Sequence, residues 1–103
     1  MEIILTSKNY EYEVENSEIP VLIDFWATWC GPCRTMTPIV QQIAEENDGK
    51  IKVCKVDIDK ERDLASKFEI MSIPTFVAIK DGKVIGTSIG VQEKEEILKM
   101  FGD

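Results

Sequence analysis

The sequence predicts an α/β domain in which helices cover both faces of a mixed β-sheet. Expected strands and helices alternate over most of the chain, which is typical of parallel strands joined by helices. Near the end, two expected strands at 75–79 and 84–89 are separated by Asp81-Gly82, a dipeptide typical of a hairpin turn. The 103 residues contain no repeat, linker or low-complexity tract, so we expect one domain spanning residues 1–103.

The first half of the chain is expected to form two strands and two helices. Residues 3–5 form a short apolar strand, and the hydroxyl side chains after them can cap a helix over residues 8–14. Residues 21–27 are almost continuously apolar, the pattern of a strand that is covered on both faces. A helix over residues 33–47 follows, because its apolar residues recur on one face. Pro38 lies inside this helix and should kink it.

The second half adds a strand, a helix, the hairpin and a final helix. Residues 51–56 are rich in β-branched side chains and form a strand. Asp59 suits the N-cap position of a helix over residues 59–68. After the hairpin, Gly90 breaks the last strand, and residues 92–101 form a helix with an apolar inner face.

Composition and charge exclude several classes of function. The chain has 19 acidic and 12 basic residues and a net charge of -7, which disfavours binding to nucleic acid and to anionic membranes. It has no histidine, which removes Cys–His nucleophile pairs and histidine metal sites. The sequence opens without a basic leader, and no apolar run approaches the ~20 residues of a membrane span. We therefore expect a cytoplasmic protein.

Two of the three cysteines are separated by two residues, in the stretch Cys30-Gly31-Pro32-Cys33 between an expected strand and an expected helix. Cysteines at this spacing can close a disulfide, and the positive charge at a helix start favours a thiolate at Cys30. The thiolate is the attacking species in disulfide exchange. The alternative is half of a zinc site, although a closed site usually takes four ligands from two such pairs. The spacing therefore favours a redox pair, with no metal.

Two charged residues and the third cysteine lie within apolar strands. Asp24 interrupts the run 21–27, and because burying a charge is costly, it is either neutral or functional. The alternative is a carboxylate that reaches water at a strand edge. Lys55 lies between Cys54 and Val56, and its alternative is an exposed strand lysine. Cys54 has no partner by spacing, so we expect it to be buried and inert.

These residues resemble those of the thioredoxin family over nearly all of the chain. A C-x-x-C pair alone is a weak signal, but the whole set occurs in the family's order and close to its spacing. The set comprises Asp24, the pentapeptide at 29–33, Pro38, Lys55, Ile73-Pro74-Thr75, Gly82 and Gly90. The resemblance implies the thioredoxin fold, a central five-stranded mixed sheet flanked by four α-helices.

The resemblance also implies an activity, that of a thiol–disulfide oxidoreductase that reduces disulfides in other proteins. Cys30 would attack the substrate disulfide, and Cys33 would resolve the mixed disulfide that forms. Asp24 would accept the proton of Cys33, with Lys55 beside it. A thioredoxin reductase that draws on NADPH would regenerate the dithiol. The implied protein is a monomer whose redox group is the Cys30–Cys33 disulfide itself, with no bound cofactor.

The resemblance further implies a docking surface for substrate proteins around the cysteine pair. The family keeps a cis proline opposite the disulfide, which assigns that conformation and a free backbone edge to Pro74. The implied apolar patch comprises Trp29, Gly31, Pro32, Met71, Ile73, Pro74, Gly90 and Val91. The alternative makes Met71 and Val91 simple core residues.

Two other functions stay open at this point. An oxidant or isomerase would use the same chemistry, although the intervening Gly31-Pro32 pair, which tunes the redox properties, resembles the reducing branch of the family. A binding module would use the fold as a docking platform without any redox step.

Overall fold

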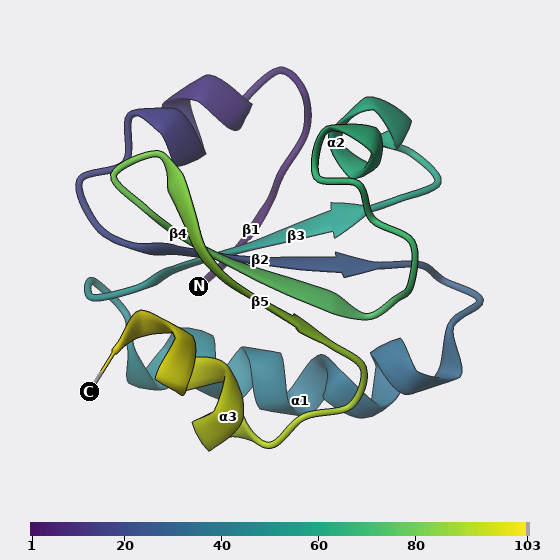
Figure 1. Cartoon of the computed structure of the whole chain (residues 1–103). Helices are drawn as coiled ribbons and strands as arrows, with labels where there is room; N and C mark the ends of the chain where they lie inside the picture. Colours follow the sequence, from purple (N-terminus) through teal and green to yellow (C-terminus); the bar gives the residue numbers. More distant parts are fainter. Residues whose placement is uncertain (103) are drawn as a thin grey trace.

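A computed structural model describes residues 1–102 and contains a five-stranded sheet in the order β1-β3-β2-β4-β5 (Figure 1). The strands are β1 (Glu2–Ile4), β2 (Val21–Trp26), β3 (Lys52–Asp57), β4 (Thr75–Lys80) and β5 (Lys83–Ile89). β1, β3 and β2 run parallel, whereas β4 is antiparallel to β2 and β5 is antiparallel to β4. Asp81 and Gly82 both have positive φ, as a tight hairpin turn requires. The predicted mixed sheet is confirmed.

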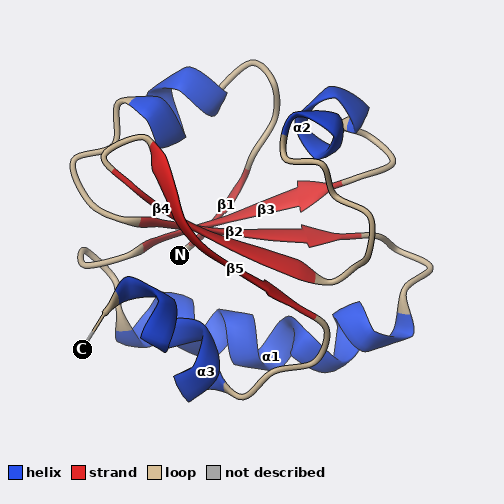
Figure 2. Ribbon diagram, in the orientation of Figure 1, coloured by secondary structure: helices blue, strands red, loops and turns tan. Residues whose placement is uncertain are grey.

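Helices cover both faces of this sheet, as predicted (Figure 2). One face carries α1 (Gly31–Glu46) and α3 (Lys94–Leu98), which continues as the 3-10 turn η2 (Lys99–Phe101). The other face carries the π-helical turn η1 (Glu11–Glu15) and α2 (Arg62–Lys67). With α3 and η2 taken as one helix, the described part of the chain forms the four helices of the expected fold.

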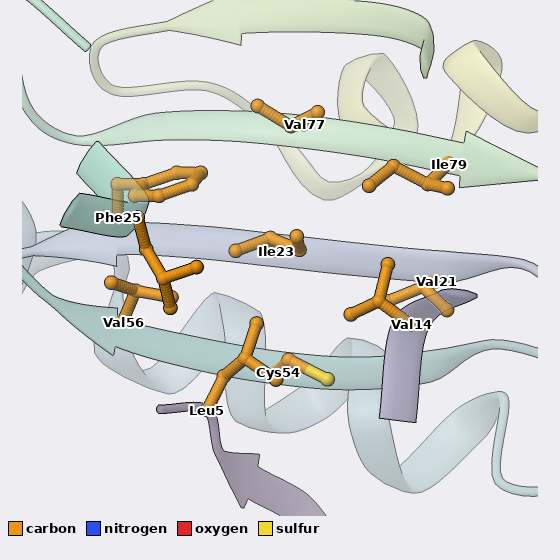
Figure 3. Close-up of a cluster of buried hydrophobic side chains, with 10 residues drawn as sticks. Leu5, Val14, Val21, Ile23, Phe25, Cys54, Val56, Val77 and Ile79 are labelled. Atoms are coloured by element: carbon orange, nitrogen blue, oxygen red, sulfur yellow. The ribbon is translucent and has the colours of Figure 1, made fainter. Parts of the chain in front are cut away.

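The central strand β2 is buried because it is covered on both sides. Its side chains alternate between the two faces. Ile23 and Phe25 pack with Val14 of η1 and Leu64 of α2, in the cluster of Figure 3, whereas Leu22 packs on the other face with α1 and α3. Burying one large apolar side chain stabilises the fold by about 1.5–3 kcal/mol. The almost continuous apolar run at residues 21–27 therefore reflects a strand with helices packed on both of its faces.

The first helix begins later than predicted. The side chain of Asn9 holds a loop in its place, because its Oδ1 accepts a hydrogen bond from the Thr6 N–H at 2.7 Å. Its Nδ2 donates to the carbonyl of Ile4 at 3.0 Å. The N–H of Thr6 and the carbonyl of Ile4 thereby form hydrogen bonds with a side chain and need no helix. The predicted helix over residues 8–14 is replaced by η1, which starts at Glu11.

The third helix is also shorter than predicted, since α2 begins at Arg62 and not at Asp59. The N–H of Asp59 donates to Oδ1 of Asp57 at 2.9 Å, which forms a side-chain turn at the end of β3. The carboxylate of Asp59 instead accepts a hydrogen bond from Nε1 of Trp29 at 2.8 Å. Asp59 is therefore occupied by a long-range contact and does not cap the helix.

Candidate active site

The paired cysteines lie where the central strand β2 passes into α1. β2 ends at Trp26 and α1 begins at Gly31, two residues before the predicted start, so Cys30 occupies the N-cap position. Cys30 and Cys33 form a disulfide with their Cα atoms 5.3 Å apart. The backbone N–H of Cys33 donates a hydrogen bond to Sγ of Cys30 at 3.1 Å. The sulfur therefore takes the place of the side-chain oxygen that usually caps a helix.

This position stabilises negative charge on the Cys30 sulfur once the disulfide is reduced. The first N–H groups of a helix carry a partial positive charge, which stabilises an anion by roughly 0.3–1 kcal/mol, and by up to ~2 kcal/mol at partly buried sites. Cys30 and Cys33 are only 4% and 5% exposed and pack with Ala27. A Cβ added to Gly31 would meet only the end of the Arg34 side chain, at 3.8 Å, so little side-chain bulk lies beside the sulfur.

The carboxyl group of Asp24 is buried on the face of the sheet that α1 covers. Asp24 is 3% exposed, and its Oδ1 has no hydrogen-bond partner among the described residues. The alternative of a carboxylate that reaches water is therefore wrong. Burial raises the pKa of Asp24 to about 7, an effect that Lys55 opposes and Glu2 reinforces. The group can therefore exchange a proton near neutral pH.

Lys55 lies directly opposite Asp24 in the register of β2 with β3. Its side chain is 21% exposed, so it is not the freely exposed strand lysine of the alternative hypothesis. Its Nζ lies 5.2 Å from the ring centroid of Trp26 and 3.9 Å from Oε1 of Glu2. Lys55 and Cys33 both line a cavity of about 260 Å³. The lysine and the second cysteine of the pair thus face the same space.

Three apolar side chains of the expected docking surface are exposed. Trp29, Met71 and Val91 are 65%, 95% and 55% exposed, so the hypothesis that Met71 and Val91 are core residues is wrong. Ile73 packs against the cysteine cluster, and the Ile73–Pro74 peptide bond is cis, as the resemblance implied. The Gly90 N–H donates to the carbonyl of Pro74 at 2.8 Å, with Gly90 in a positive-φ conformation.

Comparison with known proteins assigns the chain to a family, because the thioredoxin family model matches residues 2–103. The chain belongs to the thioredoxin family. It is 42% identical over 99 residues to a thioredoxin of Rickettsia bellii, an alignment that covers 96% of this chain and 94% of the relative. It is 39% identical over 97 residues to a thioredoxin of Bacillus subtilis, with 94% and 93% covered. It is 44% identical over 90 residues to thioredoxin 1 of a Nostoc species, with 87% and 84% covered.

Family membership and the cysteine pair together establish a thiol–disulfide oxidoreductase. The family model and the alignment to the Rickettsia bellii relative both cover nearly all of this chain. The redox pair therefore lies within the domain that the chain shares with that relative. Within residues 1–102, no group of three or more histidine, cysteine, aspartate or glutamate side chains is arranged to hold a metal ion. No helix in that part of the chain is long and apolar enough to cross a membrane.

The third cysteine of this thioredoxin-family chain lies in the core, away from the redox pair. Cys54 has a free thiol, is 0% exposed and packs with Ile23 and Val56 on the face opposite α1 (Figure 3). Burial raises the pKa of Cys54 to about 12, so the thiol stays protonated at neutral pH. The prediction that Cys54 is buried is confirmed.

Three residues at the site were missed by sequence reasoning. Glu2 approaches Lys55, Asp59 holds the Trp29 indole, and Trp26 lies under the Lys55 ammonium. All three act through contacts between segments far apart in the chain. The one available signal was the polar position of Glu2 in a short apolar strand, which the expected strand at residues 3–5 left out.

Proposed function

We propose that this member of the thioredoxin family reduces disulfide bonds in other proteins. The Cys30 thiolate attacks one sulfur of the substrate disulfide, a mixed disulfide forms, and the other substrate sulfur leaves as a thiolate. Cys33 then loses its proton and attacks Sγ of Cys30, which releases the second substrate thiolate. The protein ends as the Cys30–Cys33 disulfide and the substrate as a dithiol. The observation that carries this proposal is the Cys30 sulfur at the N-cap of α1, where a thiolate is stabilised.

Asp24 is the proposed proton acceptor for Cys33. A general base works best when its pKa lies near the working pH, and burial raises the pKa of Asp24 to about 7. The cavity of about 260 Å³ that Cys33 and Lys55 line has room for water beside the thiol of Cys33. Lys55, opposite Asp24 in the sheet, offsets the negative charge that Asp24 carries before it takes up the proton.

Substrate proteins are proposed to dock on the apolar patch around the disulfide. Exposed apolar surface next to a reactive group is typical of a protein-binding site. The proposed contact residues are Trp29, Met71, Ile73, Pro74, Gly90 and Val91. The hydrogen bond from Trp29 to Asp59 supports this role, because it fixes the orientation of a 65% exposed indole before the substrate arrives. Gly31 and Pro32 leave the approach to Cys30 open and tune the redox balance of the pair.

The catalytic cycle needs an electron donor, and the proposal assigns this role to a thioredoxin reductase that draws on NADPH. The redox group of the chain is its own cysteine pair, so no bound cofactor takes part. We place the protein in the cytoplasm, because a reductase of disulfides acts in a compartment that keeps thiols reduced. We also propose that it acts as a monomer.

A redox titration against glutathione tests the direction of the reaction. The reduced fraction of Cys30 and Cys33 is measured by alkylation and mass spectrometry across a series of glutathione buffers. A reductase must have a potential at or below that of the glutathione pool, about -220 to -260 mV by extraction. A potential above about -180 mV would support an oxidant or isomerase instead.

A variant with serine at both Cys30 and Cys33 tests the third hypothesis, a docking platform. The reductase proposal expects this variant to lose the covalent capture of disulfide-containing proteins. Partner binding that is the same in the variant and the unaltered protein would favour the docking platform.

A further inference from the structure

Three charged side chains, Glu2, Lys55 and Asp24, lie on three neighbouring strands and on the same face of the sheet. The sheet order places β3 between β1 and β2. Lys55 of β3 lies opposite Asp24 on one side and opposite Ile4 on the other. Because side chains alternate along a strand, Glu2 shares the face of Ile4, and all these residues lie on the face that α1 covers. Two carboxylates, Glu2 and Asp24, therefore lie on either side of one ammonium group.

The ammonium group of Lys55 forms an ion pair with Glu2 and none with Asp24 among the described residues. Lys55 Nζ lies 3.9 Å from Oε1 of Glu2, whereas no ion pair within 4.0 Å joins it to Asp24 in the described chain. The ring of Trp26, at the end of β2, has its centroid 5.2 Å from Nζ. Oε1 of Glu2 and Oδ1 of Asp24 are both buried atoms without a hydrogen-bond partner among residues 1–102. Two carboxylates, each with a buried oxygen that lacks a hydrogen-bond partner among the described residues, thus flank one cation, and the ion pair within 4.0 Å is with Glu2.

We infer that Glu2 is a positioning residue for disulfide exchange, because its carboxylate holds the Lys55 ammonium at the β1 edge and away from Asp24. This inference rests on the proposed role of Asp24 as the proton acceptor for Cys33. A lysine that paired fully with Asp24 would favour a permanently ionised carboxylate, which is a weak base. Because Lys55 pairs with Glu2, it stabilises the ionised form of Asp24 less, and Asp24 keeps its affinity for the proton of Cys33.

The effects of the neighbouring charges on the pKa of Asp24 agree with a Lys55 ammonium that interacts with both carboxylates. On β3, Lys55 lowers the pKa of Asp24, and on β1, Glu2 raises it, while burial is the larger cause of the rise. β4 places the uncharged Phe76 opposite Asp24. α1 contributes Cys33 and Arg34, which line the cavity shared with Lys55. Removing the charge of Glu2 acts twice in one direction, because it removes a repulsive anion and frees Lys55 to approach Asp24.

The test is an NMR titration of the Asp24 carboxyl carbon in the oxidised full-length protein, where the cysteine pair does not titrate. Glu2→Gln is expected to lower the pKa of Asp24 by at least about half a pH unit, roughly a threefold change in its proton dissociation constant. Glu2→Asp keeps the charge and is expected to retain most of the original value. Glu11→Gln is the matched control, because it makes the same charge change at an exposed position of η1.

A double-variant cycle shows whether the effect passes through Lys55. In a Lys55→Met background, Glu2→Gln is expected to move the Asp24 pKa less than it does in the original chain. An Asp24 pKa that is unchanged or raised in Glu2→Gln would overturn the inference. So would a fall of equal size in Glu11→Gln, or an equal fall with and without Lys55.

A second measurement separates this inference from the proposed function. The rate at which Cys33 resolves a mixed disulfide is measured against pH, and the inference expects its profile to move to lower pH in Glu2→Gln. An NMR shift without a shift of the rate profile would overturn the role of Asp24 as the base. It would still support the placement of Lys55 by Glu2, since the titration reports that placement independently of exchange.

Discussion

Replacing Asp24 with alanine should stabilise the protein near neutral pH and slow its turnover. The carboxyl group is 3% exposed and its pKa is raised from 3.8 to about 7. The folded state therefore binds the proton more tightly than the unfolded state. The contribution of Asp24 to stability is highest at acid pH, falls as pH rises from about 4 to about 7, and is level above that window. The alanine variant has no such group, so its advantage should grow across the same window.

The magnitude follows from the two pKa values of Asp24. They differ by about three units, and each unit corresponds to 1.36 kcal/mol, so the ionised carboxylate costs about 4 kcal/mol at pH 8. About 3 kcal/mol of this difference should arise between pH 5 and pH 8.5, at a slope that approaches about 1.4 kcal/mol per pH unit between the two pKa values and is halved at pH 7. This is a large share of the 5–15 kcal/mol that typically stabilises a domain.

Urea unfolding of the oxidised proteins at several pH values measures this effect. Urea carries no charge, so it does not screen the interaction of Asp24 with Lys55. The raised pKa values of Cys54 and Tyr10 lower stability at alkaline pH in both proteins, so they cancel in the difference. Asp24→Asn is the isosteric control and should show the same pH dependence relative to the original chain. An advantage that changes by less than about 1 kcal/mol from pH 5 to pH 8.5 would refute the reasoning.

Three further outcomes are expected. Cys30→Ser should abolish reduction of protein disulfides, whereas Cys33→Ser should accumulate a covalent mixed disulfide with the substrate, which non-reducing electrophoresis detects. Cys54→Ala should keep reductase activity and cost roughly 1 kcal/mol of unfolding free energy for a small cavity, and in the reduced original protein a thiol reagent should modify Cys54 only after unfolding. Pro32→His should raise the reduction potential in the glutathione titration, because a cationic ring favours the Cys30 thiolate, with about 30 mV for each 1.4 kcal/mol.

Each of these outcomes has a contrary result. Equal trapping by the two single serine variants would contradict the separate roles of Cys30 and Cys33. A dimer that forms under oxidant and is absent in Cys54→Ala would show that this thiol is exposed and reactive. A potential unchanged within error in Pro32→His would contradict the electrostatic account of the pair between the cysteines.

Sequence reasoning located the strands closely and the helix starts less well. The expected strand at 51–56 differs from β3 by one residue at each end, and the one at 75–79 differs from β4 by one residue at its end, because apolar and β-branched composition responds directly to burial in a sheet. Helix starts depend on single side chains whose partners lie elsewhere. α3 starts at Lys94 and not at Gln92, whose N–H donates to Sδ of Met36 in α1 and whose side chain donates to the carbonyl of Ile89.

The active site could be predicted to the extent that its residues stand out from their local sequence. Asp24 and Lys55 are charges within buried strands, and Cys30 and Cys33 have an informative spacing. Glu2 gives only a weak local signal, a polar residue beside a short apolar strand, and its partner is on β3. Only the strand order β1-β3-β2 brings them together, and that order is set by packing of the whole sheet and not by local pattern.

The disulfide closes a ring between residues only three apart in the chain and joins no two strands. In the chain-entropy model a ring of this size contributes only about 2 kcal/mol to stability. The sheet and its helices therefore outlast each opening of the bond, and the chain completes a redox cycle without refolding. A partner that distinguishes the two forms has to do so at the few residues around the cysteine pair.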